Sequence, residues 1–162
     1  MKKIIAGAAM LVAVGSAFAD NSHRMGNMAL GFDSQESDMI TGKYMVSDNL
    51  ALTGGVAFGS WGGDASGTDI AFKVGARSYM NQDDFSPFVG GHFGYSSYLD
   101  GDVTSVEFVG EFGAEYFFAK NFSVEGTAGV GYRSQDTKTP AGTVTANRLG
   151  TERAGIGFNF YF

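Results

Sequence analysis

The sequence predicts an all-β fold, an antiparallel up-and-down barrel of eight strands. Apolar residues alternate with small or polar residues at the strand period of two along most of the chain. After the first nineteen residues, no apolar run reaches the ~18 residues typical of a spanning helix. The alternation defines strands at about 27–33, 39–46, 50–60, 69–80, 87–97, 104–118, 122–134 and 149–162.

Composition narrows the class of protein. The 162 residues include 25 glycines and only two prolines, without the three-residue period of collagen. Hydrophobic residues make up 44%, so the chain can bury ample surface. The formal net charge of −6 argues against a nucleic-acid partner, which would need a basic patch. Without cysteine, disulfides and thiolate chemistry are excluded.

The first nineteen residues have the pattern of a cleavable signal peptide. Lys2 and Lys3 form a basic start, 4–14 is apolar, and Ala17 and Ala19 place small residues where a signal peptidase reads. A membrane anchor is the alternative, but the apolar stretch is shorter than the ~20 residues that a spanning helix needs. We therefore expect 1–19 to be removed and 20–162 to form one exported barrel domain.

The predicted connections alternate between two kinds. Tight-turn chemistry occurs at 47–49, 81–86 and 119–121, and longer loops occur at 34–38, 61–68, 98–103 and 135–148. The longer loops are acidic and include Asp33 at the start of the first one and Asp136 in the last. We attribute this charge to solvation. The functional alternative is divalent-cation bridging to lipopolysaccharide phosphates, or docking of a basic partner.

Parity sorts the strand residues into two faces. One face is apolar and rich in aromatic rings: Phe32, Tyr44, Phe58, Phe72, Phe93, Tyr95, Phe108, Phe112, Tyr116, Phe118, Phe122, Tyr132, Phe158, Phe160 and Phe162. The opposite face has small residues and every charge within a strand: Lys43, Lys73, Arg77, Glu107, Glu111, Glu115, Glu125, Arg133 and Arg153.

Side-chain volume indicates which face lies outside. A soluble barrel of the lipocalin type would place the apolar face inside, but an eight-stranded barrel is only just wide enough for ordinary side chains. So many rings cannot fit there, whereas small residues leave room for a few long charged ones. An apolar outside around a polar inside is the arrangement of a transmembrane barrel. Backbone groups in hydrocarbon must also be paired, so the sheet is expected to close.

The last residues carry a family resemblance. Phe158, Phe160 and the terminal Phe162 alternate after Gly157, which resembles the carboxy-terminal signature of outer-membrane β-barrels from Gram-negative bacteria. With the leader, size and glycine-rich meander, the chain resembles the small eight-stranded OmpA/OmpX-type barrels. The resemblance implies insertion by the barrel assembly machinery, contact with outer-membrane lipid and lipopolysaccharide, and a monomer. Because no residue follows Phe162 in the sequence, we expect the peptidoglycan-binding domain of OmpA-like relatives to be absent.

The interior charges are expected to form an ionic network. A hairpin centred on residue 120 places Glu107 opposite Arg133 and Glu115 opposite Glu125. Because facing like charges destabilise a sheet, Lys43 or Arg77 must reach across the lumen. The network predicts a plugged interior, with a narrow passive pore for ions or small solutes as the alternative.

The sequence has few residues in patterns typical of an enzyme active site. His92 invites comparison with the lipid A deacylases, in which a His and a Ser two residues later face outward on one strand. Here His92 has inward parity, and the residue two positions later is Gly94, so the pair is not matched. Two histidines do not make a typical zinc site without carboxylate help. We expect no metal and no cofactor, and a structural or surface-interaction role. A lipid A-modifying hydrolase is the third alternative.

Overall fold

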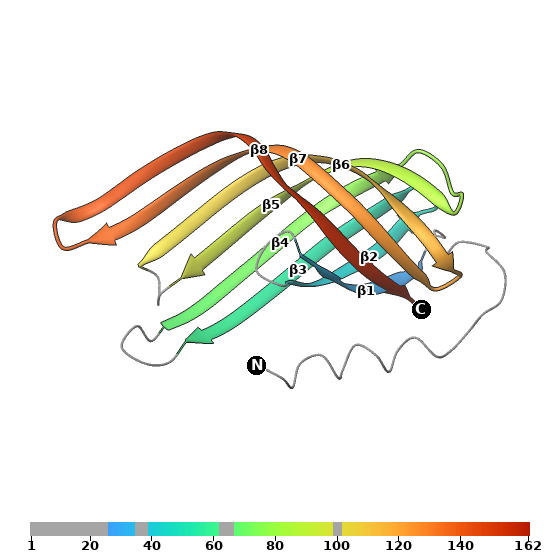
Figure 1. Cartoon of the computed structure of the whole chain (residues 1–162), viewed down its shortest axis with the longest axis horizontal. Coiled ribbons are helices and arrows are strands. Elements are labelled where there is room, and N and C mark those ends of the chain that lie inside the picture. Colours follow the sequence, from blue (N-terminus) through green and yellow to red (C-terminus); the bar gives the residue numbers. More distant parts are fainter. Residues whose placement is uncertain (1–25, 35–38, 62–66, 99–101) are drawn as a thin grey trace.

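The computed structural model describes residues 26–34, 39–61, 67–98 and 102–162, which form one closed antiparallel barrel (Figure 1). Each strand pairs with its neighbours in sequence, and the first pairs with the last. This confirms the predicted all-β antiparallel barrel. The strands are β1 (Met28–Asp33), β2 (Met39–Ser47), β3 (Leu50–Trp61), β4 (Gly67–Tyr79), β5 (Phe85–Tyr98), β6 (Val103–Ala119), β7 (Phe122–Thr139) and β8 (Gly142–Tyr161). The predicted signal peptide, 1–19, lies outside the described residues.

Three of the described short connections, those that follow β2, β4 and β6, lie at one end of the barrel. Asp48 and Asn49 join β2 to β3, and Lys120 and Asn121 join β6 to β7. The carboxy terminus reaches the same end, where the amide of Phe162 donates to the Met28 carbonyl at 2.9 Å. Among the described residues, no helix has the length and hydropathy to cross a membrane.

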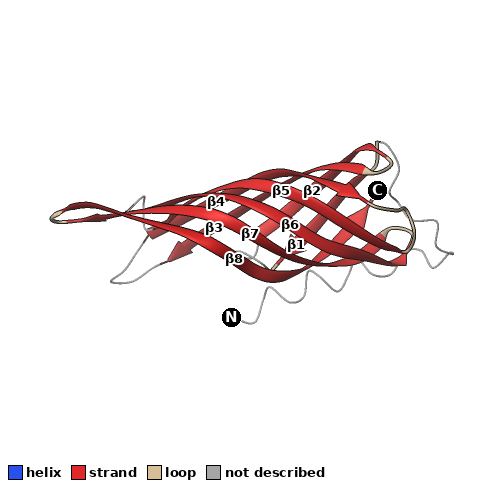
Figure 2. Cartoon of the chain, turned by 90° about the horizontal axis from the view of Figure 1, so that it is seen from above, coloured by secondary structure: helices blue, strands red, loops and turns tan. Residues whose placement is uncertain are grey.

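The prediction of the longest loop is wrong. Residues 135–148 are not a loop, because β7 continues to Thr139 and β8 starts at Gly142, beyond the predicted strands 122–134 and 149–162. The two strands stay paired up to Thr139 and Gly142, which has a φ of 129°. This hairpin extension is exposed on both faces and therefore has no apolar alternation to reveal it. Figure 2 shows it projecting beyond the other strands.

The barrel wall has unequal height. β1 pairs with β8 only from Ala29 to Asp33, and Asp33 faces Gly157. The part of β8 before Gly157 is therefore paired with β7 alone among the described strands.

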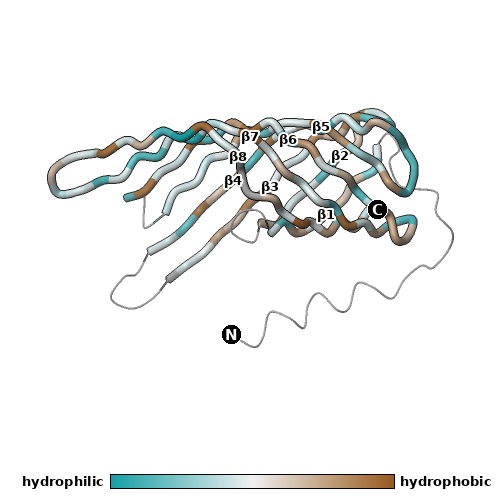
Figure 3. Tube along the Cα trace, turned by 45° about the horizontal axis from the view of Figure 1, so that its top comes forward, coloured by the Kyte–Doolittle hydropathy of each residue, from teal (hydrophilic) through white to brown (hydrophobic). Residues whose placement is uncertain are grey.

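The outer surface of the barrel is apolar. Along the strands, exposed apolar residues alternate with buried polar or small ones. Figure 3 shows the hydropathy of the residues along each strand. We call the exposed apolar side chains of the barrel wall the apolar belt. Its members are Met28, Leu30, Phe32, Ile40, Tyr44, Leu50, Leu52, Val56, Phe58, Ile70, Phe72, Val74, Val89, Phe108, Phe112, Tyr116, Phe118, Val130, Tyr132, Ile156, Phe158 and Phe162.

The interior also contains aromatic rings at the short-turn end. Tyr79 packs edge-on against Phe88 at a centroid distance of 5.6 Å, and Phe117 lies 5.3 Å from Tyr161. These four rings and Met45 are at most 2% exposed, and we call them the aromatic floor. The expectation of an inward face with only small and charged residues is therefore incomplete, because a barrel closed at one end has room for a layer of rings.

Candidate functional site

The buried charges above the aromatic floor form the candidate site. Glu115, on β6, is fully buried. Its carboxylate accepts hydrogen bonds from Lys43 Nζ (2.7 Å), Tyr79 Oη (2.8 Å), Tyr161 Oη (2.9 Å), Asn159 Nδ2 (3.1 Å) and Ser123 Oγ. Five donors from four strands, β2, β4, β7 and β8, therefore converge on one carboxylate and offset the cost of taking it out of water.

Two glutamates face each other beside this point. The register places Glu115 of β6 opposite Glu125 of β7, an arrangement that destabilises a sheet unless cations intervene. Lys43 Nζ lies 2.7 Å from Glu115 and 3.0 Å from Glu125, and Arg77 Nη1 lies 2.7 Å from Glu125. Both cations therefore reach across the lumen, Lys43 from β2 and Arg77 from β4.

Arg77 also links the lower charges to the middle of the barrel. Its Nε donates to Glu111 Oε1 at 2.6 Å, and its guanidinium carbon lies 4.5 Å from the centroid of the Phe88 ring. The planar guanidinium is thus held by two carboxylates and by a ring of the aromatic floor. This geometry suits arginine and would not be reproduced by lysine.

His92 lies among carboxylates higher in the lumen. Its Nδ1 is 3.3 Å from Glu111 Oε2, and its Nε2 is 3.6 Å from Glu107 Oε1. Arg133 Nη2 and Nε donate to Glu107 Oε2 at 2.6 Å and 3.1 Å. The Arg133 side chain is 30% exposed, so this pair forms the solvent-facing end of the charged column.

Asp33 belongs to the interior, which corrects the prediction that placed it among the acidic loop residues. It ends β1, is 6% exposed, and accepts a hydrogen bond from Lys73 Nζ at 2.5 Å. Lys73 projects from β4, so the ion pair crosses the lumen. The sequence is misleading here because Asp33 is followed by the acidic segment 34–38. Its parity with Gly31, which places it on the inward face, is the signal that indicates the correct position.

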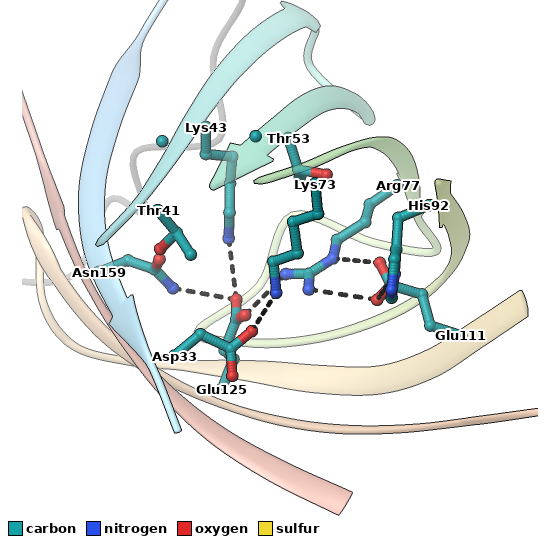
Figure 4. A pocket seen from close by; sticks show the side chains of 12 residues that line it. Asp33, Thr41, Lys43, Thr53, Lys73, Arg77, His92, Glu111, Glu125 and Asn159 are labelled. Atoms are coloured by element: carbon teal, nitrogen blue, oxygen red, sulfur yellow. Dashed lines mark hydrogen bonds and ion pairs between the residues drawn. The ribbon is translucent and has the colours of Figure 1, made fainter. Parts of the chain in front are cut away.

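We call the interior charges the ion network: Asp33, Lys43, Lys73, Arg77, His92, Glu107, Glu111, Glu115, Glu125 and Arg133. Figure 4 shows most of them around a cavity of about 20 Å³. A cavity of this size holds about one water molecule. Arg153, which was predicted to join these charges, has a side chain outside the described part of the structure.

The residues of the predicted assembly signal lie at the barrel seam. Phe158 and Phe162 point outward, 49% and 66% exposed, and Phe160 is half-buried. Gly157 faces inward, where a Cβ atom would lie 2.8 Å from Glu125 Cγ. Glycine at this position therefore leaves room for a member of the ion network.

Similarity to known proteins is distant. No protein-family model matches the sequence, and no curated protein matches it. The N-terminal β-barrel domain of Pseudomonas aeruginosa OprF matches with 16% identity and a TM-score of 0.45, over 84% of this chain and 96% of that chain. Ail, the attachment invasion locus protein of Yersinia pestis, matches with 13% identity and a TM-score of 0.37, over 85% and 99%. We therefore assign the fold of this chain from the pairing of its own strands.

The site has the chemistry of a buried electrostatic network. Nowhere in the described ranges do three histidine, aspartate or glutamate side chains gather as metal ligands would. The tyrosines of the aromatic floor were missed from the sequence, although Tyr79 and Tyr161 share the parity of Arg77 and Asn159. That parity was the available signal.

Proposed function

We propose that this chain is an integral outer-membrane β-barrel protein of a Gram-negative bacterium, with a closed interior and a structural or surface-interaction role. The observation that carries the proposal is the pairing of an apolar belt outside with an ion network inside. Water would solvate the opposite arrangement, whereas hydrocarbon favours this one. The sheet closes through the pairing of β1 with β8 from Ala29 to Asp33, and this closure satisfies backbone groups that a bilayer would leave unpaired.

The content of the lumen supports a sealed barrel. The aromatic floor fills the short-turn end, and the ion network crosses the lumen above it. Ions would pass only if several buried ion pairs separated, and breaking one such pair costs about 3–5 kcal/mol. A narrow passive pore is the competing function, and planar-bilayer recording on refolded protein separates the two. Steady conductance would contradict the sealed interior.

The surroundings of His92 support a non-enzymatic role. Its ring lies inside the barrel, with carboxylates near both nitrogens and only 9% of the side chain exposed. A lipid A substrate would approach from the belt side. Comparing lipid A from cells with and without the protein tests this point, since an altered acyl pattern would support a hydrolase.

Arg133→Ala tests the closed lumen from its upper end. The substitution removes two hydrogen bonds to Glu107 while leaving the floor and the Lys43 and Arg77 contacts in place. We expect stability to fall by roughly 1–2 kcal/mol, because the pair is partly solvated, and we expect no gain in conductance. Urea unfolding and channel recording on the same preparation measure both effects. A stable variant that conducts freely would contradict the plug.

The membrane location has a direct test. A closed barrel in detergent or lipid should migrate differently on a gel before and after boiling, and folding should require detergent or vesicles. Protein that folds and stays soluble in plain buffer would contradict the proposed location.

A further inference from the structure

The outer face of the barrel has an apolar groove across β1, β2, β3 and β4. Its volume is about 610 Å³, within the ~300–1,000 Å³ typical of ligand pockets. Its floor includes Gly42 and Gly54, which are direct partners in the β2–β3 register. Leu30 and Val74 flank this pair on the neighbouring strands, and Phe162 lines the groove near the short-turn end. We call this feature the outer groove.

Neither backbone conformation nor crowding explains the two glycines. Neither residue has the positive φ that favours glycine, and an added Cβ would lie 3.9 Å from the Ala29 carbonyl at Gly42 and 3.7 Å from the Lys73 carbonyl at Gly54. Both are ordinary contact distances. Glycine within a strand costs about 0.5–1 kcal/mol relative to alanine, and it often marks a place where a ligand approaches the backbone closely.

We propose that the outer groove binds one acyl chain of a phospholipid, an inference that rests on the proposed membrane location. The groove opens directly onto the apolar belt, and Leu30, Val74 and Phe162 belong to both. Water would find few polar partners there, and a void would forfeit dispersion contacts along the groove wall. A flexible hydrocarbon chain fits this shape and chemistry.

The position of the groove indicates which lipid supplies the chain. The groove extends from Phe162 and Met28, beside the short-turn end, to the paired residues Val56 and Phe72. Short turns lie on the periplasmic side of outer-membrane barrels, so the groove faces the inner, phospholipid-containing leaflet. We therefore assign it to phospholipid in preference to lipopolysaccharide.

Gly54→Leu fills the outer groove, and Gly110→Leu is the matched control. Gly110 also lies on the outer face, and a Cβ there would be 3.7 Å from the Val130 carbonyl, the same distance as at Gly54, but Gly110 does not line the groove. The probe is phosphatidylethanolamine with a photoreactive group on its acyl chain, in vesicles containing refolded protein. Cross-linked peptides are then identified by mass spectrometry.

We expect labelling of β1–β4 in the unmodified protein and in Gly110→Leu. In Gly54→Leu it should fall about tenfold, as expected for the loss of contact with about two methylene groups. Equal labelling in all three proteins, or equal loss in both variants, would overturn the site. Displacement of the probe by lipopolysaccharide but not by unlabelled phospholipid would overturn the assigned lipid.

Two further readouts complete the test. Protein–protein cross-links through β1–β4 that disappear in Gly54→Leu would overturn the proposal in favour of a second copy as the occupant. Heat-dependent gel migration reports whether each protein has inserted. Failure of all three proteins to insert contradicts the proposed membrane location and the lipid site together. Insertion without the loss of labelling contradicts the lipid site alone.

Discussion

Replacing Phe112 with arginine is expected to destabilise the barrel in a lipid bilayer by about 2–4 kcal/mol. Phe112 belongs to the apolar belt, is 58% exposed, and lies within β6 between Val103 and Ala119. In hydrocarbon the guanidinium would lose its hydration without gaining a partner, whereas in water the same exposed position would tolerate it. Urea-dependent folding into vesicles, followed by the mobility of unboiled protein, measures the change.

Val144→Arg is the control for the Phe112 substitution. Val144 has the same exposed fraction, 58%, but lies on the β7–β8 hairpin extension beyond the barrel wall. We expect its stability to change by less than about 0.5 kcal/mol, as for an ordinary surface substitution. Equal effects at the two positions would mean that the apolar belt does not face hydrocarbon, and the proposed location would be wrong.

Lys43→Met is expected to lower the free energy of unfolding by about 3–5 kcal/mol, the cost of leaving buried charges without their partner. The lysine ammonium lies within 3.0 Å of both Glu115 and Glu125, and its side chain is only 4% exposed. Methionine fills similar space without a charge, so the two carboxylates would face each other with Arg77 as the remaining nearby cation. Urea titration in detergent micelles gives the midpoint and the slope.

Lys138→Met controls for the loss of one positive charge. Lys138 is exposed on the hairpin extension, and its removal should leave the unfolding midpoint unchanged. In the double variant Lys43→Met/Glu125→Gln, one of the opposed carboxylates becomes neutral, so part of the lost stability should return. A Lys43→Met protein as stable as the unmodified one would show that the ion network does not hold the barrel together.

The parity of charged residues carried most of the prediction from sequence. Strands with several charges, such as β6 with Glu107, Glu111 and Glu115, fix their own inward face. Register then follows from the tight turn at Lys120, because one residue of slip would turn every side chain to the other face. The opposition of Glu115 and Glu125 was therefore predictable from the hairpin. Lys43 and Arg77 both reach across the lumen towards these two glutamates, and whether they can do so depends on the width of the closed lumen.

Three features could not be reached in the same way. The hairpin extension has water on both faces, so its strands lack an apolar side, and only β-branched residues such as Thr143 and Val144 hint at them. The register shift between β7 and β8 near Ala128 is a local irregularity with no signal in the sequence. For the aromatic floor, two rules conflict. Parity places Phe88 and Phe117 inside the barrel, whereas the narrow lumen argues against rings in the interior.

Because the wall has unequal height, the tip of the hairpin extension lies beyond the other strands. This tip is therefore a suitable site for inserting a foreign peptide. Pro140 and Ala141 join β7 to β8, far from the seam at Asp33 and Gly157. Exposed turns of this kind accept insertions most readily, because added residues disturb neither packing nor strand pairing below them. A peptide grafted between these two residues would be held away from the barrel wall, and in the proposed outer-membrane location it would be accessible to antibodies on intact cells.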